Sequence, residues 1–83
     1  FNYKSYHTIE IKKGTVGEFS KIKEEFEELE DAHLQGDKVL QICELTDLVG
    51  AIELYAMNIF NLTIDDLVKF SDKTQQSFKE GKR

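Results

Sequence analysis

The sequence contains no proline and only one cysteine, Cys43, among its 83 residues. A single cysteine cannot form a disulfide within the chain, so disulfides are excluded as a source of stability. A domain of this size has a marginal hydrophobic core and usually needs a metal or a partner chain as well. We therefore expect metal binding, oligomerisation, or both. The lone thiol fits a reducing compartment, and we expect a cytoplasmic protein.

Acidic residues outnumber basic ones, with 16 Asp and Glu against 11 Lys and Arg, and the net charge is −5. A chain with this charge repels phosphate backbones, which argues against nucleic-acid binding. Residues 39–60 are mostly apolar, but Glu44, Asp47 and Glu53 interrupt them. Because charges are costly inside a bilayer, this run predicts a buried helix and no membrane association.

The two ends of the chain carry weaker signals. Residues 1–13 contain several charges and no apolar run, so we expect no signal peptide in them. The first residue is Phe1 rather than Met, so we expect a trimmed chain or a fragment. We expect an N-terminal segment of uncertain structure at 1–14, a single domain at 15–81 and a basic tail at 82–83.

Without proline, glycines and capping residues mark where helices begin and end. The T-x-x-E pattern at 15–18 predicts a capping box and a helix over about 16–34, which Gly36 would close as a left-handed cap. Asp37 can cap a second helix over 38–60. Apolar residues recur every three or four positions in the first helix and form an apolar stripe: Phe19, Ile22, Phe26 and Leu29.

A third helix is predicted by the T-x-x-D pattern from Thr63 to Asp66, a second capping box, and Gly81 is a natural stop. Loops are then expected near 35–37 and 61–63. Three helices joined by short loops predict an all-α, antiparallel helical bundle.

The first predicted helix carries an acidic run. At about 100° per residue, Glu24, Glu27 and Asp31 should lie opposite the apolar stripe, on a solvated face. Most such runs are nothing more than that. Glu25 and Glu28, however, fall on the flank of the stripe, where partial burial is expected. As i,i+3 neighbours they are close enough to bind one ion together.

The second predicted helix carries a more informative pair, Glu44 and Asp47, which lie three residues apart on one ridge. Two carboxylates on a nearly all-apolar helix repel each other and lose hydration, at a cost of several kcal/mol per ion. The alternative is a polar strip at the rim of a bundle. A hard divalent cation, Mg²⁺ or Mn²⁺, would compensate the charge because both prefer oxygen ligands.

The short connection at 35–37 makes the two helices antiparallel neighbours, so both carboxylate pairs can converge across one groove. A site with four acidic ligands carries excess negative charge. It would take one or more Mg²⁺ ions and present them to a ligand with anionic oxygens, for which a polyphosphate is the obvious candidate.

The combined pattern, E-E-x-x-E at 24–28 followed by E-x-x-D at 44–47, resembles the signature of the MazG-like, all-α nucleoside triphosphate pyrophosphohydrolases. The resemblance extends from about Thr15 to Lys73. It implies a MazG-like helical domain completed by oligomerisation, as a homodimer or homotetramer. It also implies a Mg²⁺-dependent enzyme that cleaves a nucleoside triphosphate between its α- and β-phosphates and releases a nucleoside monophosphate and pyrophosphate.

The same resemblance implies roles for individual residues. The metal ligands would be Glu25, Glu28, Glu44 and Asp47, with Glu24 beside them as a fifth catalytic residue. Lys21 and Lys73 match family lysines that hold phosphate. The family often continues as K-N-x-x-R, whereas residues 73–77 read K-T-Q-Q-S. The missing arginine would have to be replaced by one of three residues near the C-terminus: Lys79, Lys82 or Arg83.

Asn58 shares the ridge of Glu44 and Asp47 and is a candidate contact to the base or ribose. The other polar and aromatic residues are expected to be structural. We expect His7 to be a surface residue. Four aromatic residues at helical spacing are expected in the core rather than stacked on a nucleobase: Tyr55, Phe60, Phe70 and Phe78.

Three alternatives remain open. A phosphoribosyl-ATP pyrophosphohydrolase would share the metal centre and differ in its substrate. Glu30 and His33 form E-x-x-H, which is half of a di-iron carboxylate site. The chain could also be a helical dimerisation module with exposed acidic residues, no metal and no activity.

Overall fold

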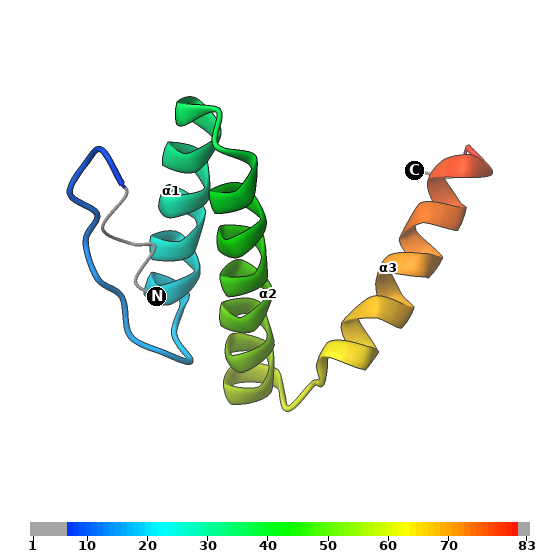
Figure 1. Cartoon of the computed structure of the whole chain (residues 1–83). Helices are drawn as coiled ribbons and strands as arrows, with labels where there is room; N and C mark the ends of the chain where they lie inside the picture. The colour runs from blue at the N-terminus through cyan, green and yellow to red at the C-terminus, as the bar shows by residue number, and fades with distance from the viewer. Residues whose placement is uncertain (1–6, 82–83) are drawn as a thin grey trace.

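The computed structural model describes residues 7–81, which contain three helices and no strand (Figure 1). The helices are α1 (Phe19–Gln35), α2 (Lys38–Phe60) and α3 (Ile64–Lys79). The predicted all-α fold is therefore confirmed. None of the helices in this range is long and apolar enough to cross a membrane. The predicted basic tail, with Lys82 and Arg83, lies outside the described residues, as does the start of the N-terminal segment.

Helix α1 begins three residues later than predicted, and the expected capping box at 15–18 is wrong. Gly17 has a φ of 86°, in the left-handed region, which a right-handed helix does not contain. The chain instead makes a turn in which the N–H of Glu18 donates to the carbonyl of Thr15 at 3.0 Å. The side-chain amide of Asn58 donates to the Gly17 carbonyl at 2.9 Å and ties this turn to α2.

The connection between α1 and α2 follows the prediction. Gly36 has a φ of 71° and donates its N–H to the carbonyl of His33 at 3.0 Å, while the N–H of Asp37 donates to Ala32 at 3.3 Å. These two bonds form a Schellman motif that closes α1. Asp37 then caps α2 by accepting from the N–H of Leu40 at 3.0 Å. The short link places α1 and α2 side by side and antiparallel (Figure 1).

Helix α3 begins at the predicted capping box. The Thr63 hydroxyl accepts from the N–H of Asp66 at 3.1 Å, and the Asp66 carboxylate accepts from the N–H of Thr63 at 3.0 Å. From there α3 extends away from the α1–α2 pair (Figure 1). It packs weakly on α2, and none of its residues is buried.

The apolar core of the described residues is small, and the aromatic residues lie largely outside it. The buried apolar side chains are Ala32, Leu40, Ala51 and Ala56. The expectation of an aromatic core is not met within one chain, because Phe60, Phe70 and Phe78 are all exposed. The buried polar side chains of the described residues are all acidic: Glu24, Glu25, Glu28, Asp31 and Glu44.

Thr63→Ala should remove one half of the α3 capping box and cost about 1 kcal/mol of helix stability. Because α3 packs weakly, we expect the loss as faster amide hydrogen exchange along α3. Ser71→Ala, at an exposed position of α3, is the matched control and should not accelerate exchange. Equal protection in wild type and Thr63→Ala would contradict this role of the cap.

The same cap should depend on pH. Hydrogen bonds from the backbone and hydroxyl of Thr63 lower the pKa of Asp66 below its ordinary value of 3.8. Its stabilising contribution is therefore present above that value and is lost as the pH falls through the lower pKa of the folded state.

Candidate metal centre

Four carboxylates meet between α1 and α2 and form what we call the carboxylate cluster. Its members are Glu25 and Glu28 from α1, and Glu44 and Asp47 from α2. One carboxylate oxygen from each lies within 4.8 Å of the corresponding atoms of the other three. The structure thus brings together the four residues that the sequence pattern suggested as metal ligands.

The cluster is almost entirely removed from solvent. Glu25 is 2 % exposed, Glu28 5 % and Glu44 0 %, while Asp47 is half-buried. Burial raises the pKa of Asp47. Within residues 7–81, both carboxylate oxygens of Glu44 and Oδ2 of Asp47 are buried and make no hydrogen bond. Buried acceptors of this kind are costly unless something compensates them. The donor set is made only of oxygens, so the residues present fit a hard divalent cation.

Lys21 and Glu24 border the cluster near the start of α1. The Lys21 ammonium lies 3.0 Å from Glu25 Oε1 and 3.1 Å from Glu24 Oε1. Burial acts to lower the pKa of Lys21, but the bonds to Glu25 and Glu24 outweigh it and raise that pKa. Glu24 was expected on a solvated face, and this is wrong: it is 3 % exposed and also accepts from the N–H of Gly14 at 2.9 Å.

Asp31 was likewise expected on the solvated face, but it is buried and holds the N-terminal segment. Its carboxylate accepts from His7 Nδ1 at 2.8 Å, from the N–H of Thr8 at 2.9 Å, from the Thr8 hydroxyl, and from Gln35 Nε2 at 3.0 Å. Burial acts to raise the pKa of Asp31, yet these bonds outweigh it and lower the pKa to about 2.

The expectation that His7 is a surface residue is also wrong. Its side chain is 5 % exposed, and Nε2 lies 3.5 Å from Glu44 Oε1 at the edge of the cluster. The sequence alternates only loosely up to Ile11 and indicates no partner for this segment, so it did not predict that His7 and Asp31 would be buried.

Gly14 lets the N-terminal segment lie against the backbone of α1. A Cβ added at this position would come within 2.2 Å of the Ser20 carbonyl oxygen and 2.5 Å of the Lys21 backbone nitrogen. Both contacts are with backbone, which cannot move aside cheaply. A side chain at Gly14 would therefore push the segment off α1 and break the bond from Gly14 to Glu24.

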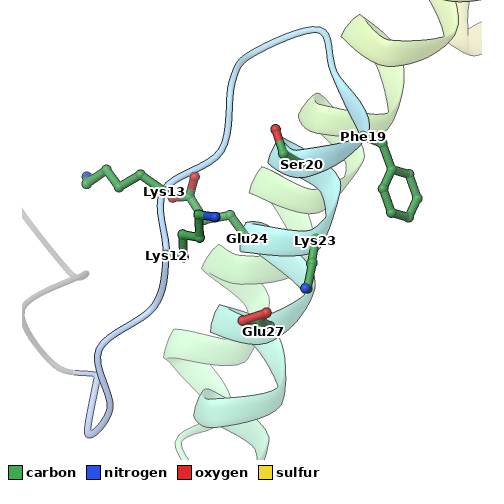
Figure 2. Close-up of a pocket in the computed structure, with 7 residues that line it drawn as sticks. All are labelled: Lys12, Lys13, Phe19, Ser20, Lys23, Glu24 and Glu27. Atoms are coloured by element: carbon green, nitrogen blue, oxygen red, sulfur yellow. The ribbon is translucent and has the colours of Figure 1, made fainter.

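A pocket of about 330 Å³ opens beside Glu24, between the N-terminal segment and the first turns of α1 (Figure 2). It is lined by Lys12, Lys13, Phe19, Ser20, Lys23, Glu24 and Glu27. Three lysines thus line this pocket together with Glu24, and the sequence interpretation named none of them as candidates. The signal that was available is the Lys12-Lys13 pair directly before Gly14.

The remaining candidates lie away from the cluster. Lys73 is exposed on α3. The amide of Asn58 is engaged with the Gly17 carbonyl, and its contact to a base or ribose stays a prediction. His33 is exposed and belongs to neither group of potential metal ligands in the described part of the chain. The structure therefore gives the E-x-x-H alternative no support.

Comparison with known families identifies this arrangement. A family model described as phosphoribosyl-ATP pyrophosphohydrolase matches residues 3–70, which include the whole carboxylate cluster. The chain belongs to this pyrophosphohydrolase family, and with it to the MazG-like, all-α nucleoside triphosphate pyrophosphatase superfamily. The resemblance drawn from the sequence is thereby confirmed. Neither the curated proteins nor the solved structures give a significant match.

Divalent cations should stabilise the folded chain. A ligand that binds only the native state raises the free energy of unfolding by about 2.7 kcal/mol when its free concentration is 100 times its Kd. Thermal unfolding with and without Mg²⁺ measures the effect. Glu44→Gln should abolish the response, and it should unfold at a higher temperature than wild type in the presence of a chelator, since it removes one buried like charge. Glu53→Gln, exposed on the same helix, is the matched control. If Mg²⁺ raised the unfolding temperature of Glu44→Gln as much as that of wild type, this would contradict a metal site at the carboxylate cluster.

Proposed function

We propose that this member of the family is a Mg²⁺-dependent nucleoside triphosphate pyrophosphohydrolase, converting (d)NTP and water to (d)NMP and pyrophosphate. The observation that carries the proposal is the buried carboxylate cluster, in which Glu44 and Asp47 present oxygens without hydrogen-bond partners among the described residues. Mn²⁺ offers the same preference for oxygen ligands and would serve as well.

In this proposal Glu25, Glu28, Glu44 and Asp47 hold the cation. When bound, it supplies Lewis-acid stabilisation of the charge that develops on the phosphate oxygens. Lys21, at 3.0 Å from the cluster residue Glu25, would steady a phosphate as a point charge. Lys12, Lys13 and Lys23 line the pocket beside Glu24 (Figure 2) and would contact the rest of the triphosphate.

Glu24 borders both the cluster and the lysine-lined pocket, where the bonds from Gly14 and Lys21 fix its carboxylate. We assign it the role of accepting a proton from the attacking water. The water oxygen forms a new bond to the α-phosphorus, and the P–O bond between the α- and β-phosphates breaks. Pyrophosphate leaves with the electron pair of that bond.

Phosphoribosyl-ATP is the second candidate substrate, and the description of the matching family supports it. The cleaved bond is the same in both substrates, so the cluster and Lys21 would act identically. Phosphoribosyl-ATP carries one further phosphate on its second ribose, which Lys12, Lys13 or Lys23 would be able to contact. The two candidates thus differ in what lies beyond the triphosphate.

We also propose that the active unit is a homodimer or homotetramer. Two apolar grooves run along α1 and α2, one lined by Phe19, Ile22, Lys23, Phe26, Leu48 and Ile52, the other by Phe26, Leu29, Glu30, His33, Gln41 and Leu45. Together with the exposed aromatic residues of α3, they form an apolar surface that a second copy would cover. In such an assembly, α3 of a partner would bring its own Lys73 toward the cluster.

Pyrophosphate release from a panel of ribo-, deoxy- and modified nucleoside triphosphates, with phosphoribosyl-ATP beside them, tests the activity and separates the substrates. Glu44→Gln and Asp47→Asn should each lower turnover more than about 100-fold, since even outer-shell changes at metal sites cost 10–100-fold. Glu53→Gln should keep wild-type turnover. Full activity in Glu44→Gln, or release of orthophosphate in place of pyrophosphate, would contradict the proposal.

Light scattering coupled to size exclusion tests the assembly. Wild type should elute as a dimer or tetramer. Phe26→Glu places a charge in both apolar grooves and should shift the chain to monomer, whereas Phe26→Leu keeps the surface apolar and should not. A monomeric wild type at micromolar concentration would contradict the assembly without touching the metal centre.

A further inference from the structure

His7 stands at the edge of the carboxylate cluster with one ring nitrogen fixed and the other directed inward. Nδ1 lies 2.8 Å from Asp31 Oδ2, and the side chain is 5 % exposed. Nε2 is buried, makes no hydrogen bond within the described residues, and lies 3.5 Å from Glu44 Oε1. A buried ring nitrogen aimed at a carboxylate at this distance points to a ligand between them.

The bond to Asp31 determines which nitrogen of His7 carries the proton. The Asp31 carboxylate also accepts from Thr8 and Gln35, and these bonds fix its position. An ionised carboxylate only accepts, so Nδ1 must donate. Since an imidazole binds a metal through a nitrogen that carries no proton, the nitrogen available to a cation is Nε2, on the side of Glu44. A carboxylate that orients a histidine in this way is the usual outer-shell partner of a metal-binding imidazole.

The ligand atoms of His7, Glu28 and Glu44 lie within 4.8 Å of one another. This second group shares Glu28 and Glu44 with the carboxylate cluster. Two ligands that are each about 2.1 Å from one cation lie at most about 4.2 Å apart. The 3.5 Å between Nε2 and Glu44 Oε1 is within that limit.

We propose that His7 Nε2 is a ligand of a second divalent-cation position, formed with Glu28 and Glu44 beside the four-carboxylate position. The inference rests on the metal-dependent part of the proposed function and not on the choice of substrate. A nitrogen donor is a poorer ligand for Mg²⁺ than for the first-row transition metals. The second position therefore favours Mn²⁺ over Mg²⁺, and Asp31 acts as the positioning residue that fixes the ring.

Mn²⁺ is the probe, because its electron spin couples to the nuclear spin of a directly bound nitrogen. Pulsed electron paramagnetic resonance of the Mn²⁺-loaded chain should show modulation from ¹⁴N, and labelling the histidines with ¹⁵N should replace it with the ¹⁵N pattern. His7→Gln should abolish this coupling and weaken Mn²⁺ binding at the second position about 10–100-fold. His33→Gln changes the other histidine, which is exposed, and should leave both readouts unchanged.

The labelling experiment uses the wild-type chain, so it decides the question even if His7→Gln fails to fold. Absence of histidine nitrogen coupling in the Mn²⁺-loaded wild type would overturn the inference. Coupling that persists in His7→Gln would overturn it as well. Pyrophosphate release without histidine nitrogen coupling would support the proposed function and rule out His7 as a ligand. Histidine nitrogen coupling without pyrophosphate release from any substrate would support His7 as a ligand and contradict the proposed function.

Discussion

Negative charge is concentrated between α1 and α2, where a helical hairpin would ordinarily place apolar side chains, and the rest of the structure accommodates this charge. Burying a carboxylate costs several kcal/mol unless it is paired or hydrogen-bonded. Lys21 compensates the charge on one side, and the N-terminal segment donates hydrogen bonds to Glu24 and Asp31. The oxygens of Glu44 make no hydrogen bond within residues 7–81. With the interior used in this way, most of the large apolar side chains of the described residues are exposed.

The parts of the structure that could be predicted are those determined by neighbouring residues in the sequence. Asp37 and the Thr63–Asp66 pair bond to amides within their own first turns, so their patterns located α2 and α3 correctly. The carboxylate cluster was predictable for the same reason. Each of its two pairs lies within one helical turn, and the two-residue link leaves the helices no arrangement except an antiparallel one.

The parts that could not be predicted depend on residues far apart in the sequence. Gly17 adopts a positive φ within a turn that Asn58 holds from α2, so a local capping pattern was misleading there. A helical wheel predicted Glu24 and Asp31 on a solvated face because it considers only the residues of one helix and no other segment of the chain. Their burial comes from residues 7–14, which bond to side chains up to 24 positions away along the sequence. The same segment brings His7 to the centre.

The tight Gly36–Asp37 connection has a consequence for the order of events during biogenesis. All four cluster carboxylates lie on the two helices that it joins. Contacts of such low sequence separation form early, since little loop-closure entropy opposes them. Association of two copies is a bimolecular step that slows on dilution. In the proposed assembly, binding of the cation would therefore precede association of the subunits.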